Sequence, residues 1–557
     1  MNRSWILNRI GVLLSLVLLL AVAAACSSGD DNGSAGAPPT AEPALGPLPT
    51  ERLLVGIVAF SQEANVRRIV GQIAGVQFDP IDESLIGMDP ATGLKVPELA
   101  TEWSLENGNA WRFKLREGVQ FHKGWGEVTA EDVKFAYEEY IKEDAVGGVR
   151  APLVRGIDNV EVVNDHEIVF HLKLFDADLT NLWSRAQPAV AIVSKKHFDS
   201  LGGDPDFSDE PLVGSGPYQF LAREQNAWIR YERFDGHRSL TPDFPEFEFR
   251  YMNESSTRLA ALLTGEIHIT NLPDDLMPQA TNGGMNVVAG TSPLRRAWMT
   301  FLCCYVDPET KAYPVHPDSP LQDIRVRQAL NKAVNRDELN ATLFAGKGDP
   351  MYVHSFASSL AGWNEDWVRN FPTAYGYDPA AAKSLLSAAG YNDQNPLETN
   401  VHVFNITQLP GAADIAEAIS AYFMDIGVKV DLVSEDSATR RAKGRSLGYS
   451  NHMWLGTTSA GQIVGSSVYT SNTSFSRSAT TPDVDAKFLQ IRAETDDGRR
   501  AQLWTEYGNL IYDSYINIPL FRLPAEVLVN PEIVASWEWP GALSGFWSHL
   551  WNVKANR

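Results

Sequence analysis

The sequence predicts a large α/β protein with more than one domain. Two observations lead to this class: strand patterns and helix patterns alternate along the chain, and no segment repeats. Alternating elements of this kind build layered α/β folds. The chain has 557 residues. The part that is expected to fold, about 500 residues, is enough for two to four domains.

The strand patterns are of two kinds. Residues 53–60 form an almost continuous apolar run, which is typical of a strand buried on both faces. Residues 111–116 and 167–174 alternate between apolar and polar residues, which predicts half-buried strands. We therefore expect strands at all three places.

Four segments carry apolar residues at helical spacing. Thr129 can cap the first of them, with two acidic residues in its first turn. Pro379 begins the third and Gly390 follows its end, which is the usual order of these residues at helix termini. The segments run from 129 to 140, from 323 to 334, from 379 to 389 and from 412 to 426, and the last leads into a strand at 428–433.

The N-terminus has the pattern of a secretory signal peptide. Arg3 and Arg9 precede an apolar run, and small residues precede Cys26. The alternative is an uncleaved membrane anchor. The run, residues 10–20, is short for a helix that must cross about 30 Å of hydrocarbon. We therefore interpret residues 1–25 as a signal peptide.

Cys26 follows three alanines and resembles the lipidated Cys of a bacterial lipobox, although Ala23 stands where Leu is more usual. Residues 26–49, which are rich in Ser, Gly, Asp, Ala and Pro, have little to bury and are expected to be a flexible linker. Stable anchoring needs more than one acyl chain. We expect a lipid-anchored protein of the cell envelope, held outside the cytoplasmic membrane on the periplasmic side or at the cell surface.

The chain is acidic. Its formal net charge is −22 at pH 7, and the predicted signal peptide contributes two arginines and no acid. This balance argues against nucleic acid and against anionic membrane surfaces as partners. It favours solubility and indicates no particular solute.

Two of the three cysteines are adjacent, Cys303 and Cys304. A redox or metal pair is one interpretation. Neighbouring side chains of a strand point to opposite faces, which suits neither a disulfide nor a chelate. We therefore expect two small buried residues within a strand.

A series of motifs resembles the family 5 extracellular solute-binding proteins, the peptide/nickel-type receptors of ABC importers. The resemblance covers nearly all of the chain after the linker, and it rests on the order of the motifs rather than on any single one. The motifs are DPATG at 89–93, VPELATEW at 96–103, REGV at 116–119, FHKG at 121–124, TAEDV at 129–133, GSGPY at 214–218, TGEI at 264–267, DIRVRQAL at 323–330, YDP at 377–379, AGY at 389–391 and IGV at 426–428.

The resemblance implies a two-lobed periplasmic-binding-protein-like fold of the large type II class, with an extra inserted subdomain. The lobes are expected to close on a solute by a hinge motion. The closed form would then dock on a membrane permease. We expect a monomer, with lobe I at residues 50–86, 200–280 and 520–557, the inserted subdomain at 87–199, and lobe II at 281–519.

The resemblance does not identify the solute. In peptide-binding members of the family, a Trp is followed three residues later by an Asp that holds the α-amine of the peptide. Here Trp454 is followed by Thr457, and a neutral hydroxyl cannot give an ammonium the charge-assisted hydrogen bond of a carboxylate. A peptide or similar small solute is our first interpretation. An oligosaccharide, stacked on some of the 15 Trp residues, is the alternative, and so is a secreted binding or sensory protein without a role in transport.

The resemblance also indicates further candidate ligand residues. Tyr422 falls where peptide-binding members carry an aromatic contact, and Asn271 and Trp298 fall near positions that face the cleft in the family. Arg440 and Arg441 lie in a region where arginines of some relatives meet a ligand carboxylate. For the aromatic residues, packing in the core is the alternative, and for the two arginines it is a solvated charged surface.

The chain shows no catalytic constellation. His166 and His171 are five residues apart on a segment that alternates like a strand, so they cannot bind one zinc from one helix face. Gly214-Ser215-Gly216 lacks the spacing of a nucleophile elbow. We expect no enzyme, no cofactor and no metal.

Overall fold

We analysed a computed structural model of the chain. Residues 47–557 form one compact unit, and all elements below belong to it. The predicted signal peptide, Cys26 and the linker up to residue 45 lie outside the described residues. The structure describes residues 46–58, 78–145, 149–173, 175–176, 179–185, 190–202, 213–291, 295–358, 360–404, 406, 409, 411–435, 437–458, 466–471, 478–541 and 547–557.

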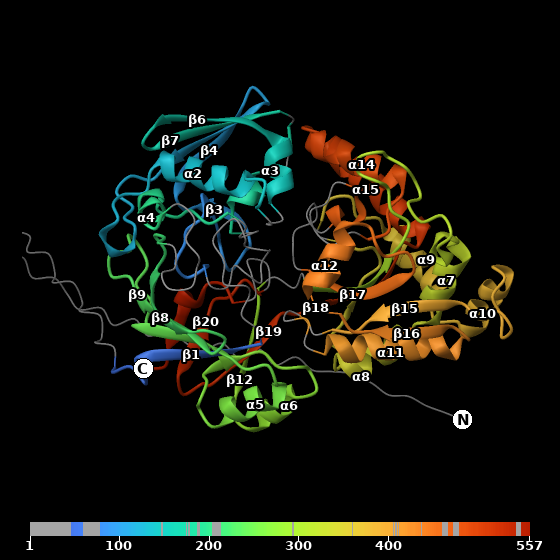
Figure 1. The fold of residues 1–557 in the computed structure, drawn as a ribbon. Helices are drawn as coiled ribbons and strands as arrows, with labels where there is room; N and C mark the ends of the chain where they lie inside the picture. Colours follow the sequence, from blue (N-terminus) through green and yellow to red (C-terminus); the bar gives the residue numbers. More distant parts are fainter. Residues whose placement is uncertain are drawn as a thin grey trace, which may run out of the picture. The chain divides into compact units, whose positions relative to one another are not determined.

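The first of two large sheets is assembled from distant parts of the sequence (Figure 1). Its central strand, β1 (Arg52–Ile57), pairs in parallel with its neighbours on both sides, and Leu53, Val55 and Ile57 are fully buried. The strand order is β12 (Asn286–Ala289), β19 (Glu526–Val529), β11 (Ile269–Thr270), β1, β10 (Glu246–Tyr251), β9 (Trp228–Arg233) and β8 (Tyr218–Glu224). Helices α5 (Ser255–Leu263) and α6 (Met277–Asn282) lie in the chain between strands of this sheet, α5 before β11 and α6 after it.

A four-stranded antiparallel sheet lies within the predicted insertion. Its order is β4 (Ala100–Glu106), β5 (Ala110–Leu115), β7 (Glu167–Leu172) and β6 (Ile157–Asn164). Helix α2 (Ala130–Ile141) begins where Asp132 accepts hydrogen bonds from the N–H and hydroxyl of Thr129. The other helices here are α3 (Arg150–Gly156) and α4 (Lys195–Ser200), with 3-10 turns at His122–Gly124 and Leu179–Trp183.

The second large sheet has helices on both faces. Helix α11 (Ala412–Asp425) packs against β15, β16 and β17 on one face, and α12 (Ser437–Arg445) lies on the other (Figure 1). The strand order is β14 (Asp349–Pro350), β18 (Asn517–Leu523), β13 (Arg295–Leu302), β17 (His452–Thr458), β15 (Glu398–His402) and β16 (Lys429–Val433). The remaining helices are α7 (Ile324–Ala333), α8 (Arg336–Leu343), α9 (Glu365–Tyr375), α10 (Pro379–Ala388), α14 (Pro482–Ala493) and α15 (Asp497–Ser514), with 3-10 turns at Pro320–Gln322 and Ser467–Tyr469.

Two small sheets complete the fold: β2 (Ile86–Met88) pairs with β3 (Lys95–Pro97), and β20 (Val534–Trp537) pairs with β21 (Val553–Ala555) next to a 3-10 turn at Leu550–Asn552. One apolar core joins the first large sheet with the four-stranded sheet. A separate core fills the second large sheet and its helices. The described residues therefore form two main cores.

The chain passes twice between the two large sheets, from β12 to β13 and from β18 to β19. The crossings touch, because the N–H of Gly290 donates to the carbonyl of Ala525 at 2.8 Å. Strand β12 belongs to the first large sheet although it lies after residue 280, the predicted end of that part of lobe I. Strand β18 belongs to the second large sheet although it extends past residue 519, the predicted end of lobe II. The five-part division itself stays a prediction.

The predicted elements are confirmed where the structure describes them. Strands β1, β5 and β7 occupy the three predicted positions, and α2, α7, α10 and α11 occupy the four helical ones. Asp323 caps α7 by accepting from the N–H of Arg325. Gly390, just past α10, has a φ of 97°, which glycine adopts without strain.

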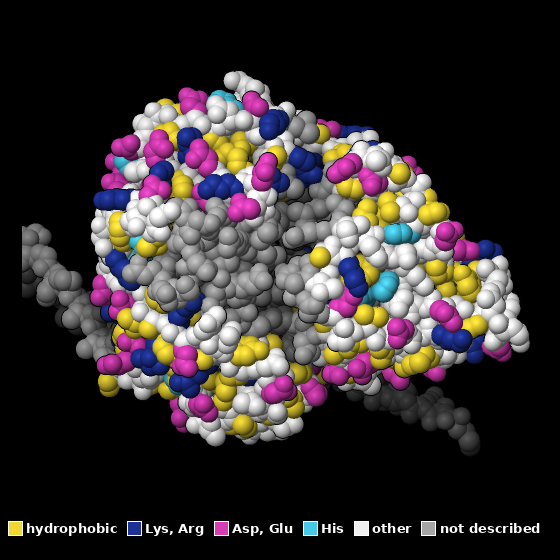
Figure 2. All heavy atoms as spheres, in the orientation of Figure 1, with side chains coloured by type: hydrophobic (Ala, Val, Ile, Leu, Met, Phe, Trp, Pro, Cys, Tyr) yellow, Lys and Arg dark blue, Asp and Glu magenta, His cyan; other side chains and the backbone are white. Residues whose placement is uncertain are grey.

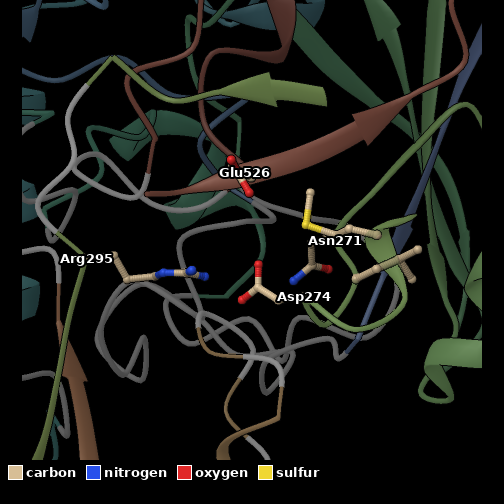
Figure 3. A pocket seen from close by; sticks show the side chains of 6 residues that line it. Asn271, Asp274, Arg295 and Glu526 are labelled. Atoms are coloured by element: carbon tan, nitrogen blue, oxygen red, sulfur yellow. The ribbon is translucent and has the colours of Figure 1, made fainter. Parts of the chain in front are cut away.

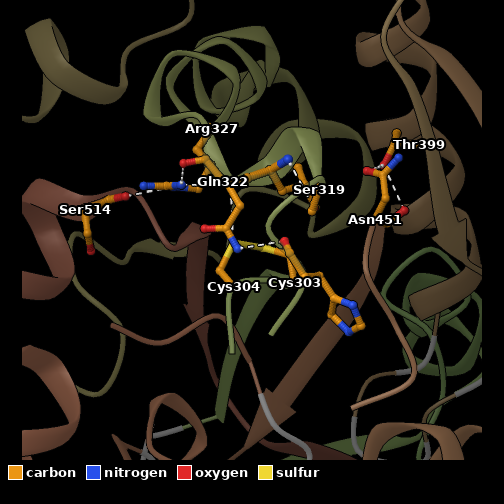
Figure 4. Close-up of a disulfide and its surroundings, with 10 residues drawn as sticks. Cys303, Cys304, Ser319, Gln322, Arg327, Thr399, Asn451 and Ser514 are labelled. Atoms are coloured by element: carbon orange, nitrogen blue, oxygen red, sulfur yellow. Dashed lines mark hydrogen bonds between the residues drawn. A yellow bond between two sulfur atoms is a disulfide. The ribbon is translucent and has the colours of Figure 1, made fainter. Parts of the chain in front are cut away.

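The prediction for the adjacent cysteines was wrong. Cys303 and Cys304 are joined by a disulfide (Figure 4). They are buried, as expected, but β13 ends at Leu302 and Cys304 has a φ of 36°, so the pair does not lie on extended backbone. The argument from opposite faces of a strand therefore did not apply.

Close packing against the backbone of Ile81 explains the glycines of the GSGPY motif. A Cβ on Gly214 would lie 2.0 Å from the carbonyl oxygen of Ile81, so only glycine fits there. The N–H of Gly216 donates to the same carbonyl at 3.0 Å. The motif thus holds two segments that are more than one hundred residues apart.

Within the described part of the chain, no helix has the length and apolarity needed to cross a membrane. On the face seen in Figure 2, acidic and basic side chains are interspersed and do not gather by sign. That face therefore shows no large patch of one charge.

Candidate functional site

Strand β13 presents different side chains to the two faces of the second large sheet. Ala297, Met299 and Phe301 point into the main core of that sheet. Trp298 and Thr300 point to the opposite face, because side chains alternate along a strand. Trp454 of β17 pairs with Thr300 and shares this second face.

Trp454 is buried, with 6% of its surface exposed, in a small apolar cluster that includes Tyr305 and Tyr449. A cation lies beside it. The guanidinium of Arg440, on α12, is 3.6 Å from the ring centroid of Phe404 and 5.8 Å from that of Trp454. This corner of the second sheet therefore combines aromatic rings with a positive charge.

A pair of histidines adjoins the cluster. The Nε2 of His402 lies 3.0 Å from the Nδ1 of His452, and Glu435 approaches the other ring nitrogen of His402 at 3.8 Å. Burial lowers the pKa of His402 to about 4 and lowers the pKa of His452 as well. Both rings are therefore neutral at neutral pH. Among the described residues, no group of histidine, cysteine and acidic side chains is arranged to hold a metal ion.

Trp298 packs against His354, which sequence reasoning did not single out. Their ring centroids are 4.1 Å apart, and both side chains are almost fully buried. The Nδ1 of His354 lies 2.8 Å from the hydroxyl of Ser355, which has a φ of 69°. The Nε1 of Trp298 and the Nε2 of His354 have no hydrogen-bond partner. Such groups are rare in folded proteins and call for an explanation.

The surroundings of His354 are positively charged. Burial and the neighbouring Arg296 hold the pKa of His354 well below 6.5, so its ring is neutral. Arg296 is itself buried, which lowers its pKa to about 10, and it pairs across the strands with Arg522. This region therefore favours an acceptor or an anion over a cation.

Thr457 is not next to Trp454 in space. The two are three positions apart on a regular strand, so they point to opposite faces. Thr457 pairs with Ala297 and shares its face, and the Thr457 hydroxyl is buried without a partner. Their joint role in solute binding stays a prediction.

Tyr422 and Asn271 lie elsewhere. Tyr422 is half-buried on α11, where burial and a hydrogen bond with Glu338 of α8 raise its pKa to about 12. Asn271 is fully buried just after β11. The structure places Trp298 and Trp454 on one face of the second large sheet and each of the other three predicted ligand residues elsewhere, and their role stays a prediction.

Asn271 lines a small pocket beside the crossings between the two large sheets (Figure 3). Glu526 begins β19 of the first large sheet, and Asp274 lies between β11 and β12 of the same sheet. Arg295 begins β13 of the second large sheet. Lys347 bridges the parts, with its Nζ 2.5 Å from Glu526 and 3.5 Å from Asp274. Burial raises the pKa of Asp274 and lowers that of Arg295. The remaining lining residues are Leu272 and Met277.

Residues 95–476 match the model of the bacterial extracellular solute-binding proteins, family 5. The chain belongs to this family. It is 26% identical over 385 residues to the dipeptide-binding protein of Escherichia coli (strain K12), which covers 65% of this chain and 68% of that protein. The family assignment made from the motifs is confirmed.

Solved structures of this family have the same fold. The periplasmic binding protein DppA from Helicobacter pylori, in complex with the peptide STSA, matches with a TM-score of 0.74 at 20% identity, over 91% of this chain and 98% of that one. AgaA from A.tumefacien R10, in complex with agropinic acid, matches with a TM-score of 0.74 at 21% identity, over 91% and 99%. The predicted two-lobed fold is therefore confirmed, and the large sheets are the centres of lobes I and II.

The chain is therefore a bacterial extracellular solute-binding protein, as the motifs predicted. The sequence predicted the two lobes but not the surroundings of the candidate residues. His354 had no signal in the sequence, because its importance comes from packing against Trp298, 56 positions away in the chain. Arg440 had only a weak signal, a basic residue in a basic helix.

Proposed function

We propose that the chain is a lipid-anchored receptor that captures short peptides or other small solutes with a carboxylate, and delivers them unaltered to an importer. The observation that carries this proposal is the set of unpaired polar atoms in lobe II. The Nε1 of Trp298 can only donate a hydrogen bond. The Nε2 of His354, whose ring packs against that of Trp298, is also unpaired.

The tautomer of His354 follows from its neighbour. If the Ser355 hydroxyl donates to Nδ1, then Nε2 carries the proton and donates. Trp298 and His354 then offer two donors close to the charge of Arg296. A carboxylate or carbonyl of the solute satisfies such donors, whereas an ammonium does not.

The absence of an acid at position 457 fits the same proposal. The solute is held by its acceptor groups, so its amine need not be bound by the residue that peptide-binding relatives use. The ligands in two structural relatives, the peptide STSA and agropinic acid, both carry a carboxylate. The proposal thus covers peptides and peptide-like acids.

An oligosaccharide is less well supported. Sugars stack on open aromatic faces, and the rings of Trp454 and Trp298 are 6% and 4% exposed. Neither ring offers an open platform in this structure. The described residues therefore favour an acidic solute over a sugar.

A matched ligand series tests the class of solute. Residues 47–557 are titrated by calorimetry with a dipeptide, its N-acetyl derivative, its C-terminal amide and maltotriose. We expect the dipeptide and the N-acetyl derivative to bind alike, and the amide to bind at least tenfold more weakly. Equal binding of the amide, or tight binding of maltotriose, would overturn the proposed class.

The lipid anchor is a separate part of the proposal, and it rests on Cys26 and the sequence before it. The protein would act as a monomer on the outer side of the cytoplasmic membrane. Cells expressing the full chain are fractionated and compared with a Cys26→Ser variant. We expect the parent in the membrane fraction and the variant in the soluble fraction. Equal partition would remove the anchor from the proposal.

A further inference from the structure

An ion pair joins the inserted subdomain to lobe II. Asp176 lies between β7 and the 3-10 turn at Leu179–Trp183, and Arg492 lies in the last turn of α14. The Nε of Arg492 donates to Oδ1 of Asp176 at 3.1 Å, and the Nη2 contacts Oδ2. The two side chains are only 8% and 18% exposed. They are 316 positions apart in the sequence, so the pair forms only through the tertiary fold.

A second pair of opposite charges faces across the same contact. Arg155 of α3 is in the inserted subdomain, and the charge of Asp485 on α14 acts on it. Asp485 is held within lobe II, where its carboxylate accepts from the N–H and hydroxyl of Ser471 at 2.8 and 2.5 Å. The inserted subdomain thus presents Arg155 and Asp176, and α14 presents Asp485 and Arg492, in complementary order.

Arg492 is largely buried at this contact. Its pKa is lowered to about 10, by burial first and by the charge of Arg155 second. Two guanidinium groups would therefore repel each other here without their acids. The carboxylates of Asp176 and Asp485 offset that repulsion only while the two surfaces are together.

This contact lies away from the connections between the lobes. The chain crosses between the large sheets near Gly290 and Ala525, and Lys347 bridges to Glu526 beside those crossings. In Figure 1, α3 and α14 meet at a place distant from β18 and β19. A rotation of the lobes about the crossings would separate α3 from α14 and expose the ion pair to water.

We propose that Asp176 and Arg492 form a closure latch that holds part of the population closed even without solute. The proposal rests on the proposed function, since it concerns the same opening and closing that admits the solute. A contact present only in the closed state shifts the equilibrium by its differential stability, whatever the solute is. The latch therefore lowers the rate of solute release and sets how much closure the solute itself must drive.

The latch is tested without any solute. Dyes are placed on cysteines introduced at the exposed positions Glu143, in the inserted subdomain, and Asp393, in lobe II. The disulfide leaves Cys303 and Cys304 without a free thiol. Single-molecule energy transfer on residues 47–557 then measures the ratio of closed to open molecules.

We expect Asp176→Asn and Arg492→Gln each to lower the closed-to-open ratio about tenfold, because each removes the ion pair between the inserted subdomain and α14. Lys487→Gln is the matched control, since Lys487 lies on the same helix but pairs with Glu506 inside lobe II at 2.5 Å. It should leave the ratio unchanged. Asp176→Arg should open the protein further, since three guanidinium groups then meet.

The charge-swapped pair gives the rescue. Asp176→Arg combined with Arg492→Asp places both positive charges on the subdomain and both negative charges on α14, so closure should return to within about threefold of the parent. Singles that behave like Lys487→Gln, or a parent that is fully open without solute, would overturn the latch. A protein that binds no acidic solute but shows these ratios would overturn only the proposed function.

Discussion

Trp298 of β13 covers Gly456, its partner on β17. A Cβ on Gly456 would lie 2.6 Å from two atoms of the indole ring, Cε2 and Cζ2. Glycine is needed because the indole ring occupies the space where a side chain would lie. The φ of Gly456 is not positive, so the backbone conformation does not itself require glycine. The position of Trp298, and hence of its unpaired Nε1, therefore depends on the absence of a side chain at residue 456.

Gly456→Ala should displace the indole. We expect the free energy of unfolding to fall by about 1–3 kcal/mol, as in other overpacked cores, and the affinity for solute to fall with it. Urea denaturation and calorimetric titration measure the two effects. Gly498→Ala is the control, because the atom nearest to its added methyl is Oδ1 of Asp496 at 3.4 Å. An unchanged affinity in Gly456→Ala would show that Trp298 is not near the solute.

Trp454→Ala should weaken solute binding. Trp454 is buried, so the same change should also lower the free energy of unfolding by about 3–5 kcal/mol. Trp367→Ala separates the two effects, since Trp367 is as well buried on α9, in the main core of lobe II. We expect the control to lose similar stability and to keep its affinity. Equal affinities of parent and Trp454→Ala would remove Trp454 from the site.

The disulfide gives a chemical prediction. When residues 47–557 are denatured without a reductant, neither Cys303 nor Cys304 should react with iodoacetamide, and after reduction both should react. Mass spectrometry of the peptide that contains them reads the result. The compartment proposed for the protein is oxidising, which allows the bond to persist. Cys304→Ser should leave one reactive thiol. Alkylation of both cysteines before reduction would contradict the structure.

A buried acidic group should make stability depend on pH. The Nε of Arg185 donates to Glu98 at 2.6 Å and its Nη1 to Asp79 at 3.0 Å, so several carboxylates share one guanidinium. Burial raises the pKa of Glu98 to about 7 and that of Asp79 to about 6. The folded state therefore binds protons that the unfolded state has released, and stability from these groups is lost as pH rises through their folded pKa values.

Buried histidines with lowered pKa values, such as His402 and His549, act in the opposite direction below about pH 6.5. The clear window for Glu98 is therefore pH 6.5–8.5. There we expect the parent to lose about 1 kcal/mol relative to Glu98→Gln, which keeps the shape and cannot ionise. Urea denaturation at both pH values gives the difference. A parent and variant with parallel pH dependence would show that Glu98 is already ionised at pH 6.5.

The elements most fully predicted from sequence are those whose pattern is local. Helix α7 carries its buried residues at helical spacing and its cap in Asp323, so the sequence alone places it. Strand β5 alternates in the same visible way. The family motifs predict the two-lobed fold as well. One of them, GSGPY, marks a close backbone contact, that of Gly214 with Ile81.

The site was less predictable because it depends on distant contacts. Trp454 and Thr457 were considered together by their spacing, yet residues three apart on a strand point to opposite faces. The disulfide was missed because the chain leaves the strand at Leu302, and no local pattern marks that point. The latch joins residues that no spacing connects.

Native mass spectrometry of residues 47–557, purified from the source cells and followed by denaturing release of the bound molecule, tests the central claim most directly. We predict one small molecule per chain that carries a carboxylate, either a short peptide or a peptide-like acid. A released sugar, or any tightly bound solute without an acidic group, would contradict the account of an acidic solute held through the donors of lobe II.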